Sequence, residues 1–160
     1  MTIKVGDKMP EGKFKTMMAD GASEVTAESL FAGKKVLLFS VPGAFTPTCS
    51  QKHLPGYVAN AAALKSKGID TIACMAVNDV FVMNAWGQSA NVADKVLMLA
   101  DGNGDYVKSL GLELDARGFG MGVRGQRFSI IVDNGVVTQL NIEPAGKFEV
   151  SSAECALGQL

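Results

Sequence analysis

The chain has 160 residues, of which 48% are hydrophobic and 19% are charged, and its formal net charge is −1. This composition excludes intrinsic disorder, and the length predicts one domain over residues 1–160 whose core needs neither a metal nor a disulfide. Charges of both signs are evenly spread and no apolar stretch is long enough to cross a bilayer, so neither nucleic acid nor a membrane is an expected partner.

The N-terminal part of the chain predicts a hairpin followed by a short helix. Residues 1–7 lack the apolar core of a signal peptide, so we expect a cytoplasmic protein. Residues 14–17 pair in the expected hairpin with the residues before Val25, through a turn at Asp20-Gly21. Thr26 is then suited to cap a short helix that ends near Gly33.

The next segment predicts a strand, a tight loop and an interrupted helix. Residues 36–39 form a short apolar run, as expected of a strand that is buried on both faces. A loop rich in proline and glycine follows and ends at Cys49. The helix after it should be kinked near Leu54, because Pro55 has no backbone N–H and clashes with the preceding turn. Helical character then resumes and is expected to stop at Gly68.

The middle of the chain continues the alternation of strands and helices. The expected elements are a buried strand over 69–77 that contains Cys74, a helix from the cap Asp79 to about Ala90, a strand over 96–100, a turn at 101–104, and a short helix over 106–110 closed by Gly111. Residues 116–125 hold four glycines without periodicity, which predicts a loop.

The last part of the chain predicts a hairpin and a terminal helix. Asn134-Gly135 supplies the positive φ angles of a two-residue turn between strands over 128–132 and 136–142. Residues 151–154 match a capping box that would begin a C-terminal helix. This order of elements favours an α/β fold in which a mixed sheet is flanked by helices, and it is compatible with a thioredoxin-like core.

Cys49 is the candidate nucleophile. A strand delivers the chain to the loop that ends at this residue, and free N–H groups at the start of the following helix favour negative charge on the sulfur. The thiolate is the reactive form of cysteine.

The residues around Cys49 resemble a known family. Pro42, Thr46 and Cys49 match the Pro-x-x-x-Thr-x-x-Cys signature of the peroxiredoxins, which are thiol peroxidases on a thioredoxin-like core. Residues 50–57 and the late segment 127–129 resemble the type II, or fifth, class of that family, and the resemblance covers nearly the whole chain.

The resemblance implies a catalytic site of Cys49, Thr46, Arg127 and Pro42. Cys49 would be oxidised to a sulfenic acid while hydrogen peroxide or a small organic hydroperoxide is reduced, an antioxidant activity that needs no cofactor and no metal. The Thr46 hydroxyl would hydrogen-bond to the thiolate and the peroxide, the guanidinium of Arg127 would hold sulfur and oxygen, and Pro42 would shield the thiolate. Arg124 lies nearby, and Arg127 is preferred for its place at the start of a strand.

The reductant is left open between several thiols. Three cysteines at wide spacings fit neither a disulfide framework nor a paired zinc site, so reduced thiols are expected. Cys74 resembles the second cysteine of plant-like type II enzymes, whereas Cys155 does not align with the resolving cysteine of the animal fifth class. Without a secure internal partner, the sulfenic acid would be reduced by glutathione, glutaredoxin or thioredoxin. The resemblance also implies a homodimer.

Two other functions remain as alternatives. His53, the only histidine, lies four residues after Cys49 and would share its helical face, as in cysteine hydrolases or transferases. Alternatively, the protein is a non-enzymatic redox sensor with a thioredoxin-like fold. The peroxidase interpretation requires an anionic sulfur beside a guanidinium and a hydroxyl, in a pocket that oxidant can enter.

Overall fold

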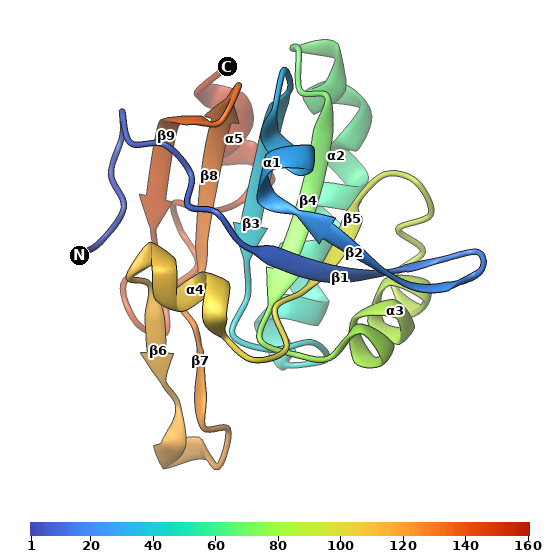
Figure 1. The fold of residues 1–160 in the computed structure, drawn as a ribbon, viewed down its shortest axis with the longest axis vertical. Coiled ribbons are helices and arrows are strands. Elements are labelled where there is room, and N and C mark those ends of the chain that lie inside the picture. The colour runs from blue at the N-terminus through green and yellow to red at the C-terminus, as the bar shows by residue number, and fades with distance from the viewer.

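The computed structural model describes residues 1–160, and its centre is a mixed sheet of seven strands in the order β2-β1-β5-β4-β3-β8-β9 (Figure 1). The strands are β1 Lys13–Met18, β2 Gly21–Thr26, β3 Lys35–Ser40, β4 Thr71–Ala76, β5 Leu97–Ala100, β8 Phe128–Asp133 and β9 Val136–Ile142. The pairs β3–β4 and β4–β5 are parallel, and the other pairs are antiparallel.

Helices cover both faces of the sheet, and Figure 1 looks onto the face that carries α1 and α4. The helices are α1 Ala27–Phe31, α2 Leu54–Ser66, α3 Val80–Ser89, α4 Asp105–Leu110 and α5 Ala153–Gly158. One core lies between the sheet and α2, α3 and α5, and it includes Leu37, Phe39, Ile72 and Cys74. Side chains pointing the other way from the same strands pack against α1 and α4. The continuous apolar runs of β3 and β4 are explained by this burial on both faces. No helix is both long and apolar enough to cross a membrane.

Several local predictions are confirmed. The N-terminal hairpin is β1–β2, and the Thr26 hydroxyl accepts a hydrogen bond from the Ser29 N–H at 3.1 Å as the cap of α1. Asp79 caps α3 in the same way. In the β8–β9 hairpin, Asn134 and Gly135 both have positive φ, 48° and 82°. The predicted α/β class, with helices flanking a mixed sheet, is therefore correct.

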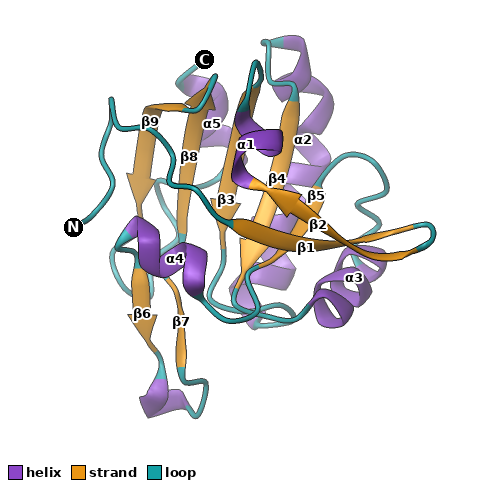
Figure 2. Ribbon diagram, in the orientation of Figure 1, coloured by secondary structure: helices purple, strands orange, loops and turns teal.

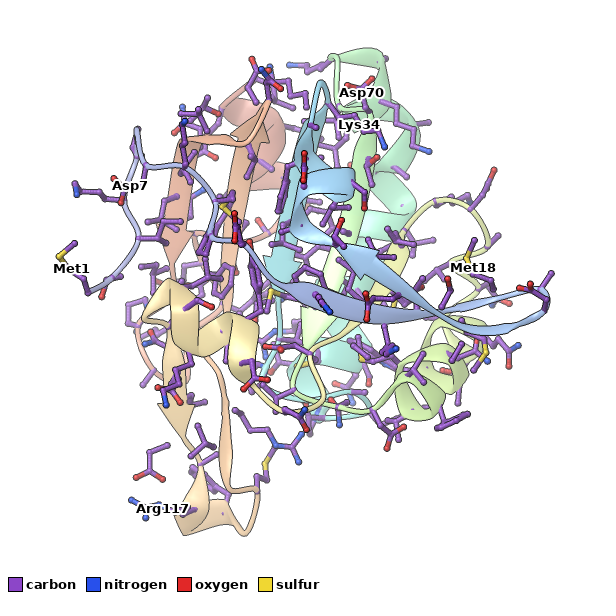
Figure 3. All side chains as sticks on the ribbon, viewed as in Figure 1. Met1, Asp7, Met18, Lys34, Asp70 and Arg117 are labelled. Atoms are coloured by element: carbon purple, nitrogen blue, oxygen red, sulfur yellow. The ribbon has the colours of Figure 1, made fainter.

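Two local predictions are wrong. Residues 116–125 are not all loop, because β7 Val123–Gly125 pairs with β6 Glu113–Asp115 and a 3₁₀ turn, η2 Arg117–Phe119, lies between them. The β6–β7 hairpin extends from the body of the molecule in Figure 2, and Arg117 lies at its tip in Figure 3. The C-terminal helix is capped by Ser152 instead of Ser151, because the Ser151 hydroxyl is bonded to Glu143.

Candidate active site

The loop from β3 to Cys49 is held by hydrogen bonds to the loop that follows β4. β3 and β4 are parallel neighbours, so their carboxyl ends meet at one edge of the sheet. There the N–H of Ala44 donates to the side-chain oxygen of Asn78 at 2.9 Å. Gly43 lies so close to Arg124 that a Cβ atom on it would be 3.2 Å from the guanidinium. These contacts anchor the middle of the loop at Gly43 and Ala44, and Cys49 follows five residues later.

Cys49 begins a turn of π-helix, η1 Cys49–His53, and not the expected α-helix. The N–H of Leu54 reaches back five residues to the Cys49 carbonyl. Pro55 supplies the physical reason, because it cannot donate to the carbonyl four residues before it and its ring would clash there. The predicted interruption near Leu54 thus occurs as a wider turn, which carries both Cys49 and His53.

Arg127 is the cation at the sulfur. Its Nη2 donates to Sγ of Cys49 at 3.0 Å. The antiparallel register that pairs Ser40 with Phe128 brings the residue before β8 next to the end of β3. Arg124 points elsewhere and donates to the carbonyls of Met121 and Val77. Of the two candidate arginines, the structure places Arg127 beside Cys49.

His53 contacts Arg127 and not Cys49. Nη1 of Arg127 lies 2.7 Å from Nδ1 of His53, and Nε2 of His53 lies 3.0 Å from the Ser151 carbonyl oxygen. The carbonyl can only accept, so Nε2 carries the proton and Nδ1 is the acceptor. Burial is the main cause that lowers the pKa of His53 to about 3, and the charge of Arg127 is the second cause. A histidine with both nitrogens engaged cannot take a proton from Cys49, so the cysteine–histidine dyad of the alternative interpretation is not formed.

The segment that holds His53 is itself held by Glu143. One carboxylate oxygen of Glu143 accepts four hydrogen bonds, from the N–H groups of Glu149, Val150 and Ser151 and from the Ser151 hydroxyl, at 2.7 to 2.8 Å. Burial raises the pKa of Glu143, but these hydrogen bonds outweigh it and leave the pKa below its usual value. The role of Glu143 could not be predicted from the sequence, because its neighbours in the chain carry no motif. The only local signal at Ser151 is the capping box.

Thr46 and Pro42 lie in the loop, and neither residue forms a hydrogen bond with the sulfur. The Thr46 hydroxyl donates to the Gly43 carbonyl at 2.7 Å, so its proton is used within the loop. Pro42 lines a cavity of about 440 Å³, together with Thr48 and Arg127. The rest of the cavity lining is formed by residues 143–147 and by Leu114, Phe119 and Gln126.

The sulfur does not lie in an open pocket, contrary to the expectation from the sequence. Cys49 is 0% exposed and is not among the residues that line the cavity. An oxidant molecule in the cavity can contact Arg127, which donates a hydrogen bond to the sulfur. The oxidant can contact Cys49 itself only after the side chains around the sulfur are displaced.

The other two cysteines are free. Cys74 lies in the middle of β4, opposite Phe39 of β3 and Met98 of β5, and is 0% exposed. Burial is the main cause that holds the pKa of the Cys74 thiol well above its usual value, and the nearby Cys49 is the second cause. Cys155 lies near the start of α5 and donates to the Glu149 carbonyl.

Known proteins match this chain over nearly its whole length. The family model described as Redoxin matches residues 4–157. The chain is 50% identical to Peroxiredoxin-2D of Arabidopsis thaliana over 99% of its own length and 98% of that protein's. Peroxiredoxin-2E, chloroplastic, of the same plant is 52% identical and is covered to 70% of its length. The crystal structure of reduced Prx3 in complex with H₂O₂ from Vibrio vulnificus matches with a TM-score of 0.95, at 51% identity, over 99% of both chains.

Proposed function

Because this chain belongs to the peroxiredoxins of the redoxin family, we propose that it reduces hydrogen peroxide and small organic hydroperoxides through Cys49. The predicted thioredoxin-like fold and the resemblance to type II peroxiredoxins are confirmed by the same comparisons. The observation that carries the proposal is the guanidinium of Arg127, 3.0 Å from Sγ of Cys49. The relative from Vibrio vulnificus was crystallised with hydrogen peroxide, which supports the choice of substrate.

In the proposed reaction the Cys49 thiolate attacks the terminal oxygen of the peroxide. A sulfur–oxygen bond forms and the O–O bond breaks, so the cysteine becomes a sulfenic acid. The departing hydroxide or alkoxide then takes a proton and leaves as water or alcohol. The positive charge of Arg127 stabilises the thiolate and the negative charge that develops on the leaving oxygen. Thr46, through its hydroxyl, and Pro42, through the shape it imposes on the loop, complete the proposed site.

The buried sulfur adds a requirement to this reaction. The cavity lined by Pro42, Thr48 and Arg127 would admit the peroxide, and the loop must then open enough to expose Sγ. Phe45 supports such an opening, because it holds a φ of +63° that a side chain of this size rarely adopts and is 54% exposed.

An external thiol is the proposed reductant. Two thiol groups of the donor are oxidised to a disulfide, the sulfenic acid returns to a thiol, and its oxygen leaves as water. Glutathione, glutaredoxin or thioredoxin would supply them. The burial of Cys74 within a hydrogen-bonded strand supports an external donor, since a disulfide from that position would require the strand to move.

Assembly and location complete the proposal. We propose one catalytic domain over residues 1–160 that forms a homodimer, for which the exposed aromatic side chains of Phe45 and Phe119 near the site are the support. A reducing compartment such as the cytoplasm suits an enzyme with three free thiols, and one relative is named chloroplastic. Light scattering on the purified protein tests the dimer.

Turnover is the test of the proposed function. The wild-type protein should consume peroxide repeatedly when a thiol donor is present, and Cys49→Ser should abolish this, whereas Cys155→Ser should retain it. Mass spectrometry after one equivalent of peroxide, without thiol, should show one added oxygen on Cys49. A loss of two hydrogens would instead mean that Cys74 or Cys155 forms a disulfide. A protein that is oxidised once and never turns over would be a redox sensor.

A further inference from the structure

Arg127 has an unusual set of partners for a half-buried arginine. It forms no salt bridge. Its side-chain hydrogen bonds go to a sulfur, Sγ of Cys49, and to a neutral nitrogen, Nδ1 of His53. The Phe148 ring lies 5.9 Å from the guanidinium carbon and adds a weak attraction. The guanidinium is thus oriented without a carboxylate that would cancel its charge.

His53 is held in place independently of Arg127. Its ring is 0% exposed and packs against Phe39, Tyr57 and Phe148, with centroids 4.9 to 5.6 Å apart. The Ser151 carbonyl accepts the Nε2 proton and so leaves the Nδ1 lone pair directed at Arg127. The orientation of the acceptor is therefore determined by the segment that Glu143 binds.

We propose that His53 is the positioning residue that aims Arg127 at Cys49, with its tautomer selected by the Ser151 carbonyl. This inference rests on the proposed peroxidase function. A long arginine side chain loses much rotational freedom when it is fixed, and the short hydrogen bond that Arg127 donates to a rigid ring offsets part of that loss. A neutral acceptor leaves the full positive charge for the thiolate, whereas an acidic residue at position 53 would compete with it.

Three substitutions separate positioning from packing. His53→Asn places an acceptor oxygen near the position of Nδ1 and should keep the rate of Cys49 oxidation by hydrogen peroxide within about threefold of wild type. His53→Gln reaches toward Ser151 but removes the acceptor for Arg127, and it should lower the rate about tenfold, as should His53→Ala.

Tyr57→Phe is the matched control. The Tyr57 hydroxyl donates to the same Ser151 carbonyl at 2.8 Å but does not touch Arg127. Removing it perturbs the packing around His53 without changing the Arg127 hydrogen bond, so the oxidation rate should match wild type. An equal loss in Tyr57→Phe and His53→Gln would mean that only packing matters, and it would overturn the proposal.

A measurement on the unaltered protein guards against variants that do not fold. His53 is the only histidine, so nitrogen NMR of the labelled protein reports on it without ambiguity. We expect a neutral ring with the proton on Nε2 at neutral pH. A proton on Nδ1, or a charged ring, would refute the assigned role. A wild-type protein that does not react with peroxide would refute the proposed function instead, whatever the tautomer.

Discussion

Arg127 and His53 are joined by a hydrogen bond of 2.7 Å that only a neutral imidazole can accept. The pair is therefore not an ion pair, and its positive charge belongs to the guanidinium alone. This relationship turns a residue that sequence spacing suggested as a base for Cys49 into a support for the neighbouring cation.

Replacing Arg127 tests the cation directly. Arg127→Ala should slow the oxidation of Cys49 by hydrogen peroxide about a hundredfold, because the stabilising charge on the thiolate and the leaving oxygen is lost. Arg127→Lys should recover only part of the rate, since an ammonium group cannot reach Cys49 and His53 together. Stopped-flow measurement of the oxidation rate gives the comparison.

Arg117→Ala is the control for the loss of an arginine. Arg117 lies at the tip of the β6–β7 hairpin, as Figure 3 shows. It is exposed and pairs with Asp115. This variant should oxidise at the wild-type rate. An equal rate loss in both arginine variants would point to net charge and not to the contact with Sγ.

Thr46 should act through its hydroxyl. Thr46→Val keeps the shape but removes the hydrogen bond to the Gly43 carbonyl and any polar contact with the peroxide, so the rate should fall about tenfold. Thr46→Ser keeps the hydroxyl and should stay near wild type. The same stopped-flow assay decides, and a fully active Thr46→Val would remove Thr46 from the proposed site.

Glu143→Gln should destabilise the fold and loosen the segment behind His53. The carboxylate oxygen accepts four hydrogen bonds, and a neutral amide is a weaker acceptor, so the free energy of unfolding should fall by about 2 kcal/mol. The folded pKa of Glu143 lies below its unfolded value, so its contribution is present above that value and disappears as pH falls through the folded pKa. Urea denaturation at neutral and acidic pH measures both effects.

His53 should make the fold sensitive to mild acid. Its pKa is about 3 in the folded state against 6.5 as the ordinary value, so between these pH values the unfolded chain binds the extra proton. Stability from this group is therefore complete above 6.5 and declines as pH falls toward 3. Arg127 and Glu143 are the charged groups that face His53. The His53→Asn variant should show a flatter dependence of unfolding free energy on pH, and an unchanged slope would contradict the low pKa.

Local signals in the sequence were sufficient for most of the fold. The caps Thr26 and Asp79 and the Asn134-Gly135 turn are determined by neighbouring residues, so they were predicted correctly. The β6–β7 hairpin was missed because strands of three residues among glycines leave no alternation to detect.

The candidate site likewise contains features that the local sequence predicts and features that depend on long-range packing. Cys49, Thr46 and Pro42 lie in one continuous loop and were found together, and Arg127 was found through the family resemblance. The link from His53 to Ser151 joins residues 98 positions apart and depends on the packing of α2 against α5, which no spacing in the sequence reveals. The burial of Cys49 is likewise a property of the packed structure.

The central position of Cys74 has a consequence for survival under heavy oxidant load. With an external thiol as the proposed reductant, a sulfenic acid that neither Cys74 nor Cys155 reaches stays available to a second peroxide molecule, which would convert it to the sulfinic acid and end activity. The lifetime of the enzyme would then depend on the ratio of peroxide to free thiol around it, so that a surge of oxidant inactivates the molecules that a steady supply leaves working.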